Sequence, residues 1–162
     1  MAATYRFSTA EGHRVGRRAI GFLEEDIPEG EGESRVDAKE VFDTLTPHRK
    51  CELRTRFDYW LDWGINDRWF HGWPNDHEVK ACFCFKWSER RQNHRLYGFL
   101  FHPKPTINPG FQVCVLVYHD AKNDESTDRS LLIRVMGLYG NPVVHAAIRF
   151  IFPDKKNGEQ IQ

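Results

Sequence analysis

Basic and aromatic side chains concentrate in one stretch of a chain whose net charge is zero. Residues 80–104 contain six basic residues and a single acid, Glu89. The basic residues are Lys80, Lys86, Arg90, Arg91, Arg95 and Lys104, and they are interleaved with the rings of Phe83, Phe85, Trp87 and Tyr97. Cations bind phosphates and flat rings stack on bases, so this stretch is typical of a binding site for a polyanion such as RNA.

The period of this stretch predicts strands that hold the side chains in place. In residues 79–87 the odd positions are apolar, while Lys80 and Lys86 occupy even positions and are expected on an open sheet face. A polar turn and the return segment 95–102 complete an antiparallel hairpin. The apolar run 111–118 predicts a central third strand, with His119 and Lys122 where it emerges.

Helices are expected on both sides of these strands. Residues 36–45 have the apolar spacing of a short amphipathic helix, and Thr46 and Pro47 favour the start of a second helix that ends at Gly64. These two helices should cover one sheet face. A further helix is expected over 126–138. Residues 143–152 are interpreted as helix because Asn141 and Pro142 precede them, although they also alternate tolerably as a strand.

The expected fold class is therefore α+β. We expect a small antiparallel sheet of four to five strands, two N-terminal helices on one face and a C-terminal helical segment, with weaker strand patterns at 4–8 and 15–23. A length of 162 residues favours a single domain, residues 1–162, that ends in a polar tail, 153–162.

An acidic insert, residues 24–43, contrasts with the basic stretch. It contains nine acidic and two basic residues, and its first half has Pro28, Gly30 and Gly32 but no apolar period. Two interpretations stay open. The insert is either a solvated linker or an acidic flap that lies near the basic stretch and competes with a polyanionic ligand.

The four cysteines, Cys51, Cys82, Cys84 and Cys114, fall in segments predicted to be buried helix or strand, as expected for reduced core thiols. Cys82 and Cys84 share a strand face, and His71 or His77 could complete a metal site with them, but the spacing is not that of a zinc motif. We expect no metal and no cofactor. No apolar window reaches the length of a membrane span and no secretory signal is evident, so a cytoplasmic protein is expected.

Two segments carry a resemblance to a known family. The hairpin CFCFKWSERRQNHRLYGFL (residues 82–100) and the segment VCVLVYHDAKNDESTDRSLLIRV (residues 113–135) resemble the RelE/ParE superfamily of toxins, especially its HigB-like, phage-associated branch. The resemblance implies a toxin that cuts mRNA on the ribosome without a metal and is held by a cognate antitoxin protein. A ParE-like inhibitor of DNA gyrase and a plain RNA-binding module of the same fold are the alternatives.

The resemblance also implies roles for individual residues. Arg91 and Arg95 would clamp the scissile phosphate, Lys122 would add positive charge, and His119 would be the general acid or base. The expected RNA contacts are Lys80, Lys86, Arg90, Tyr97 and Lys104. Because they come from neighbouring antiparallel strands, Lys86, Arg91, Arg95, His119 and Lys122 are expected to converge on one face.

Overall fold

Six strands and four helices make up the part of the chain that the structure describes. This computed structural model describes residues 4–10, 16–28, 32 and 35–156. The elements are β1 (Thr4–Thr9), β2 (Arg18–Asp26), α1 (Ala38–Thr44), α2 (Pro47–Leu61), β3 (Phe70–Gly72), β4 (Cys82–Glu89), β5 (Gln92–Phe101), β6 (Gln112–Lys122), α3 (Arg129–Tyr139) and α4 (Pro142–Ile151). The α+β class is confirmed.

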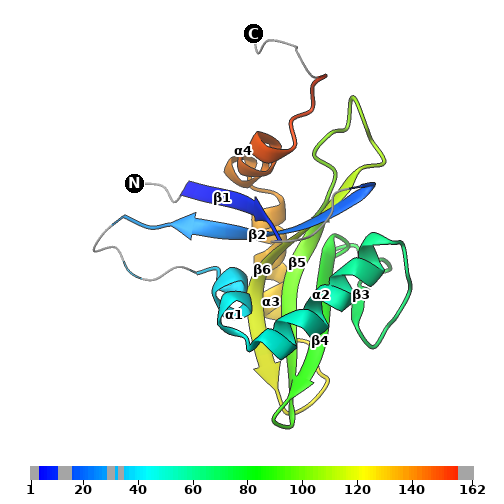
Figure 1. Cartoon of the computed structure of the whole chain (residues 1–162). Coiled ribbons are helices and arrows are strands. Elements are labelled where there is room, and N and C mark those ends of the chain that lie inside the picture. Colours follow the sequence, from blue (N-terminus) through cyan, green and yellow to red (C-terminus); the bar gives the residue numbers. More distant parts are fainter. Residues whose placement is uncertain (1–3, 11–15, 29–31, 33–34, 157–162) are drawn as a thin grey trace.

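All six strands belong to one mixed sheet in the order β1-β2-β6-β5-β4-β3 (Figure 1). The pair β2–β6 is parallel and the other pairs are antiparallel. The prediction of an antiparallel sheet with four to five strands is therefore wrong in detail. The segment from α1 to β5 forms the long crossover that a parallel pair needs, and β3, with three residues, is too short to show a period.

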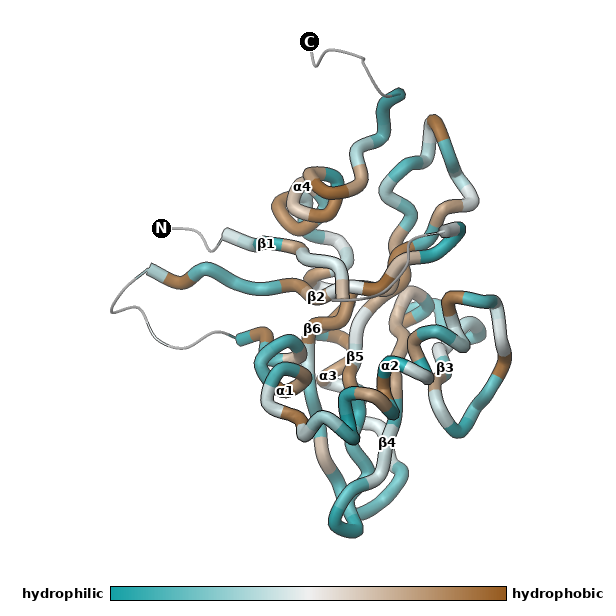
Figure 2. Tube along the Cα trace, viewed as in Figure 1, coloured by the Kyte–Doolittle hydropathy of each residue, from teal (hydrophilic) through white to brown (hydrophobic). Residues whose placement is uncertain are grey.

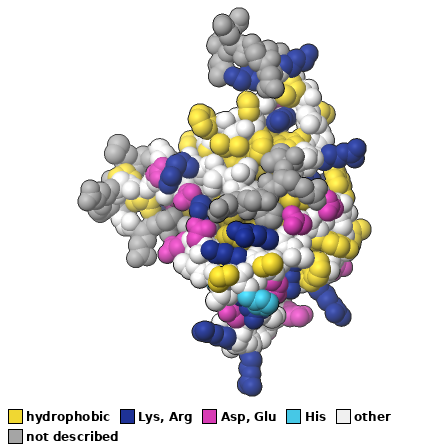
Figure 3. Space-filling model, in the orientation of Figure 1, with side chains coloured by type: hydrophobic (Ala, Val, Ile, Leu, Met, Phe, Trp, Pro, Cys, Tyr) yellow, Lys and Arg dark blue, Asp and Glu magenta, His cyan; other side chains and the backbone are white. Residues whose placement is uncertain are grey.

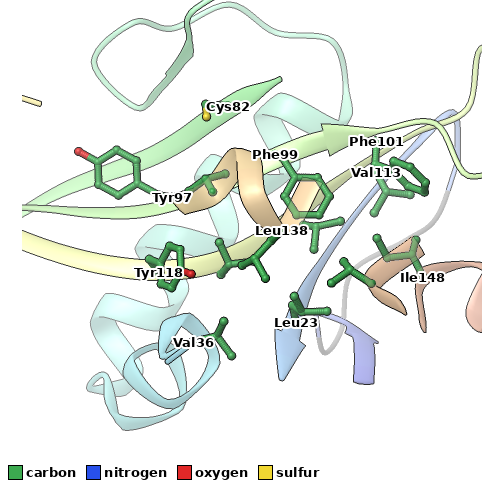
Figure 4. Close-up of a cluster of buried hydrophobic side chains, with 14 of the residues drawn as sticks. Leu23, Val36, Cys82, Tyr97, Phe99, Phe101, Val113, Tyr118, Leu138 and Ile148 are labelled. Carbon is green, nitrogen blue, oxygen red and sulfur yellow. The ribbon is translucent and has the colours of Figure 1, made fainter. Parts of the chain in front are cut away.

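Helices cover both faces of the sheet. On one face α1 and α2 bury Phe42, Phe57 and Trp60 against Phe85 of β4, so the prediction of two N-terminal helices on one face is confirmed. On the other face α3 and α4 form a second core with Tyr97 and other residues of the sheet (Figure 4). The C-terminal helical segment is thus confirmed as well.

The second core corrects the prediction of an open face on β4. Cys82 and Cys84, on the same face as Lys86, are buried, and the Cys82 thiol lies 3.4 Å from the carbonyl oxygen of Leu132 in α3. The period of β4 shows which residues share a face. It does not show that α3, from a later part of the chain, covers the even positions, while α1 and α2 cover the odd ones.

Side-chain caps fix the starts of α2 and α4 as their residue types suggest. Thr46 accepts a hydrogen bond from the amide of Arg49 at 3.4 Å, and Asn141 accepts one from Val143 at 2.9 Å, which confirms α4 as a helix. The end of α2 differs, because the left-handed residue is Trp63, with a φ of 65°, and not Gly64. Gly64 is required for close approach instead, since a Cβ there would lie 2.2 Å from the Tyr59 ring.

A bulge interrupts the pairing of β5 with β6. Tyr97 faces Tyr118 but Gly98 faces Leu116, so Val117 has no partner on β5. The carbonyl of Val117 accepts a hydrogen bond from the amide of Asp37 at 3.0 Å. One extra residue reverses the facing of every later side chain on β6. This reversal determines which side chains meet in the site described below.

The acidic insert is only partly described, since residues 29–31 and 33–34 lie outside the described residues. Glu24 and Asp26 belong to β2, where Asp26 pairs with Arg6 of β1 at 2.9 Å. The carboxylate of Glu25 accepts a hydrogen bond from the amide of Arg35 at 3.0 Å. These acids lie toward β1, at the sheet edge opposite β3 and β4, so their positions lend no support to the flap interpretation.

Apolar residues concentrate along the centre of the sheet and on α4, whereas the connecting loops are mostly polar (Figure 2). Among the described helices, none is by itself long and apolar enough to cross a membrane. The pair α3 and α4 passes that test only when the two are taken together across a bend of 67°.

Candidate functional site

A pocket of about 740 Å³ opens at the edge of the sheet, where β4 continues past Phe70, the first residue of β3. Its walls come from α2, the segment that precedes and enters β3, the strands β4 and β5, and the loop 123–128. It is lined by Glu52, Arg56, Asp67, Arg68, Trp69, His71, Lys86, Trp87, Ser88, Asn93, His94, Arg95, Glu125 and Thr127. Four of these residues are Lys or Arg and three are acids, so the wall is polar with a small excess of positive charge.

Main-chain hydrogen bonds at Lys86 fix the mouth of the pocket. The amide of Lys86 donates to the carbonyl of Trp69 at 2.8 Å, and the carbonyl of Lys86 accepts from the guanidinium of Arg56. Arg56 is held in turn by Glu52 of the same helix at 2.8 Å. Arg56 thereby lies along the edge of β4 beyond the first residue of β3. Backbone groups of β4 would otherwise be unpaired there.

Lys86 and Arg95 form the charged centre of the pocket. They are directly opposite residues of β4 and β5, so both side chains lie on the α3 face of the sheet. The Arg95 side chain is buried, at 8% exposure. Its guanidinium donates to Thr127 Oγ1 at 2.7 Å and to the carbonyl of Glu125 at 2.9 Å. Within the described residues no carboxylate forms an ion pair with Arg95.

This arrangement makes further positive charge in the pocket unfavourable. Burial lowers the pKa of Lys86, and the neighbouring Arg95 charge lowers it further. Burial also lowers the pKa of His71 to about 4, and the charges of Lys86 and Arg95 contribute. His71 is therefore neutral near pH 7. An anion bound between these groups would reverse the balance, because it stabilises each protonated form.

His119 lies on the other face of the sheet. It is opposite Leu96, on the side covered by α1 and α2, and its Nε2 lies 3.0 Å from Nδ1 of His94. His94 in turn stacks on Trp87, with ring centroids 4.9 Å apart. The prediction that His119 converges with Arg95 is therefore wrong. Strict alternation along β6 favours that prediction, and the bulge at Val117 reverses it.

Two other predicted residues share the face of Arg95. Lys122 is opposite Asn93 on that face and lies 3.7 Å from Asp120, outside the pocket lining. Tyr97 is fully buried beneath the pocket, where its hydroxyl accepts from Arg95 at 3.3 Å and its ring stacks on Trp73 at 6.3 Å. Tyr97 thus has no exposed ring face for a base and instead supports Arg95.

The remaining predicted residues lie outside the pocket. Lys80 is exposed before the start of β4, and Lys104 packs over the Phe111 ring at 4.8 Å. Arg90 and Arg91 form the turn between β4 and β5 and are exposed, so Arg91 does not clamp a phosphate together with Arg95 in this pocket.

The structure adds Arg56, Arg68 and His94 to the site, none of which stands out in the sequence. Arg56 belongs to a helix with many charged residues, and only the packing of α2 on β4 selects it. His71 was noticeable as a possible metal ligand near the cysteines. Its ring nitrogens lie 3.8 and 3.9 Å from the Cys84 sulfur.

The cysteines are placed mostly as expected. Cys82, Cys84 and Cys114 are buried, whereas Cys51 is exposed on α2, contrary to prediction. Burial raises the pKa of Cys84 to about 11 and that of Cys82 to about 12, so both are protonated core thiols. Among the described residues no group of three His, Cys, Asp or Glu side chains is arranged to hold a metal ion.

Comparisons of this chain with protein-family models, with curated proteins and with solved structures found no match.

Proposed function

We propose that this protein is an endoribonuclease that cuts mRNA on the ribosome and thereby inhibits translation, as the toxin of a toxin-antitoxin pair. Apart from β1, the short strand β3 and α4, the element order is β2, α1, α2, β4, β5, β6, α3. This order supports the proposal, because the resemblance to RelE-like toxins rests on one strand, two helices, three antiparallel strands and a helix. A cognate antitoxin protein would hold the toxin inactive.

The observation that carries the proposal is the opposed pair of Lys86 and Arg95 in the pocket. Two cations lie on one face, and one of them is buried and hydrogen-bonded only to neutral groups, so a bound anion would stabilise both charges. A phosphodiester would lie between them, with the guanidinium fork on its non-bridging oxygens.

The reaction needs a base, a cation and an acid. The ribose 2′-oxygen attacks the adjacent phosphorus as its proton leaves, and the bond from phosphorus to the 5′-oxygen breaks as that oxygen gains a proton. The products are a 2′,3′-cyclic phosphate and a 5′-hydroxyl. Arg95 would stabilise the negative charge that develops on the phosphorane oxygens.

His71 and Lys86 are the candidates for proton transfer. His71 is neutral near pH 7 and would accept the 2′-hydroxyl proton, and its pKa would rise as negative charge develops on the phosphate. Lys86, whose pKa is lowered by burial, would give a proton to the leaving 5′-oxygen more readily than an exposed lysine. These roles replace the one that the resemblance implies for His119.

Substitution of His71 and Lys86 tests this assignment in a translating extract. We expect His71→Gln and Lys86→Gln to abolish inhibition of translation, with at least about a hundredfold less mRNA cleavage, because general acid and base groups each contribute about 10²–10⁴-fold. His119→Gln should retain activity, since His119 does not line the pocket. If His119→Gln is inactive while His71→Gln is active, the assignment is wrong.

A gyrase supercoiling assay distinguishes the alternative target. The proposal predicts that the native protein leaves supercoiling unchanged at concentrations that stop translation. Inhibition of supercoiling with intact mRNA would favour a ParE-like function instead.

A further inference from the structure

The turn between β4 and β5 consists of two arginines in an unfavourable backbone conformation. Glu89 pairs with Gln92, so Arg90 and Arg91 are the whole connection, and their φ angles are 52° and 64°. Positive φ at both positions is what a type I′ hairpin turn requires, and the sequences that favour this turn are Asn-Gly, Asp-Gly and Gly-Gly. Long side chains rarely adopt this conformation, because the Cβ approaches the following carbonyl.

Contacts within the protein do not explain why arginine occupies these positions. Both side chains are exposed, and in the described part of the chain neither forms an ion pair or a side-chain hydrogen bond. Figure 3 shows Lys and Arg side chains projecting into solvent at the end of the molecule where the β4–β5 hairpin turns in Figure 1. A strained, exposed segment with no internal partner indicates a role in binding.

We infer that the turn Arg90–Arg91, here named the arginine turn, docks on the phosphate backbone of folded RNA. The inference rests on the proposed function and names a second contact for the same ligand. Each arginine presents a planar fork of donors that matches phosphate oxygens, and a two-residue turn is narrow enough to approach a helical backbone closely. The ribosome presents such a surface in its folded RNA.

The position of the arginine turn separates docking from cleavage. It lies four residues beyond the Lys86–Arg95 pair along each strand, roughly 13 Å at the rise of a β-strand. It therefore contacts phosphates other than the one in the pocket. The nearby carboxylate of Asp124 accepts hydrogen bonds from Ser126 at 2.5 and 2.9 Å, so this acid is engaged within its own loop.

The test uses three variants of the full chain. Arg90→Asn with Arg91→Gly installs the preferred turn sequence and removes both charges. Arg90→Lys with Arg91→Lys keeps the charge in the same backbone. Arg6→Gln with Arg134→Gln removes two exposed arginine charges elsewhere, on β1 and α3, as a control for net charge. Binding to a fluorescein-labelled RNA stem-loop is measured by anisotropy over a range of salt concentrations, and the midpoint of thermal unfolding is measured for each protein.

The Asn-Gly variant should unfold at a higher temperature than the native protein and yet bind the stem-loop about tenfold more weakly at 0.1 M salt. A plot of log affinity against log salt concentration should have a slope that is smaller in magnitude by about two, one for each lost phosphate contact. The Lys-Lys variant and the charge control should bind within about threefold of the native protein. Native affinity and native salt dependence in the Asn-Gly variant would overturn the inference.

The outcome separates this inference from the proposed function. If the Asn-Gly variant binds RNA as the native protein does while His71→Gln loses mRNA cleavage, docking by the arginine turn is wrong and the nuclease assignment stands. If the Asn-Gly variant loses RNA affinity but native protein leaves mRNA intact, the turn is an RNA-docking element in a protein that is not a nuclease.

Discussion

Lys86 of β4 faces Arg95 of β5, and Asp120 of β6 is the residue opposite Arg95 on the other side. The two cations are held differently. Arg95 is bonded to Thr127 and to the carbonyl of Glu125, whereas the ammonium of Lys86 donates to the carbonyl of Asp67. The loop 123–128 and the segment before β3 are thus each attached to one member of the pair.

Substitution of these two cations should separate stability from binding. Arg95→Leu should lower the free energy of unfolding by about 1–3 kcal/mol, because the carbonyl of Glu125 and the hydroxyl of Thr127 lose their donor. Lys86→Met should change it by less than about 1 kcal/mol, since the lost hydrogen bond is offset by the removal of a desolvated charge. Urea denaturation measures both values. Equal stability of Arg95→Leu and the native protein would contradict the contacts assigned to Arg95.

The stability of the protein should fall as the pH decreases from about 6.5 to about 4. His71 has a pKa of about 4 in the folded state and an ordinary value of 6.5, so the unfolded chain binds the proton more tightly in this window. The share of His71 in this loss is at most about 3 kcal/mol. Burial also lowers the pKa of His119, which acts in the same direction.

Urea denaturation at several pH values checks this expectation. Between pH 6.5 and pH 4 the free energy of unfolding of His71→Gln should change less with pH than that of the native protein. The matched variant His119→Gln removes the contribution of His119 to the pH dependence. A native curve that stays level down to pH 4 would show that His71 is not held neutral by its surroundings.

Asp37 joins α1 to the bulge in β6. Its amide donates to the carbonyl of Val117 at 3.0 Å and its carboxylate accepts from the amide of His119 at 2.8 Å. Asp37→Ala should lower the free energy of unfolding by about 1–3 kcal/mol, because a half-buried amide loses its charged acceptor. The matched control is Asp43→Ala on the exposed side of α1, for which thermal unfolding should show a loss below about 1 kcal/mol.

Gly98 and Gly137 should respond in opposite ways to the same substitution. A Cβ at Gly98 would lie 2.0 Å from the carbonyl oxygen of Val115, so Gly98→Ala should cost more than about 2 kcal/mol or displace the bulge. Gly137 lies within α3, and a Cβ added there would have nothing within 4 Å. Gly137→Ala should therefore raise the free energy of unfolding by about 0.5–1 kcal/mol. Chemical denaturation of both variants checks the register of β5 with β6. Tolerance of alanine at Gly98 would contradict that register.

Local patterns predicted the elements of this fold well. The alternation in residues 79–87, the cap Thr46 with Pro47, and Asn141 with Pro142 each depend on neighbouring residues, and β4, α2 and α4 follow from them. The parallel pairing of β2 with β6 and the cover of Cys82 and Cys84 by α3 depend on distant parts of the chain. No local pattern in the sequence signals either feature.

The candidate site was predictable only in part for the same reason. Lys86 and Arg95 were found because they lie on the two strands of one hairpin, whose pairing the turn determines. His119 was misplaced because one unpaired residue, Val117, changes the face of all later residues on β6. Arg56 joins the site because α2 packs on β4, and His71 joins it because β3 pairs with β4. The spacing of residues in the sequence predicts neither contact.

Sequencing of reporter mRNA ends from a translating extract tests the central claim most directly. With native protein, the account predicts cuts within the translated region that leave a 2′,3′-cyclic phosphate and a 5′-hydroxyl, and at least about a hundredfold fewer cuts with Lys86→Gln. Intact mRNA with the native protein, or cleavage by Lys86→Gln at the native rate, would contradict it.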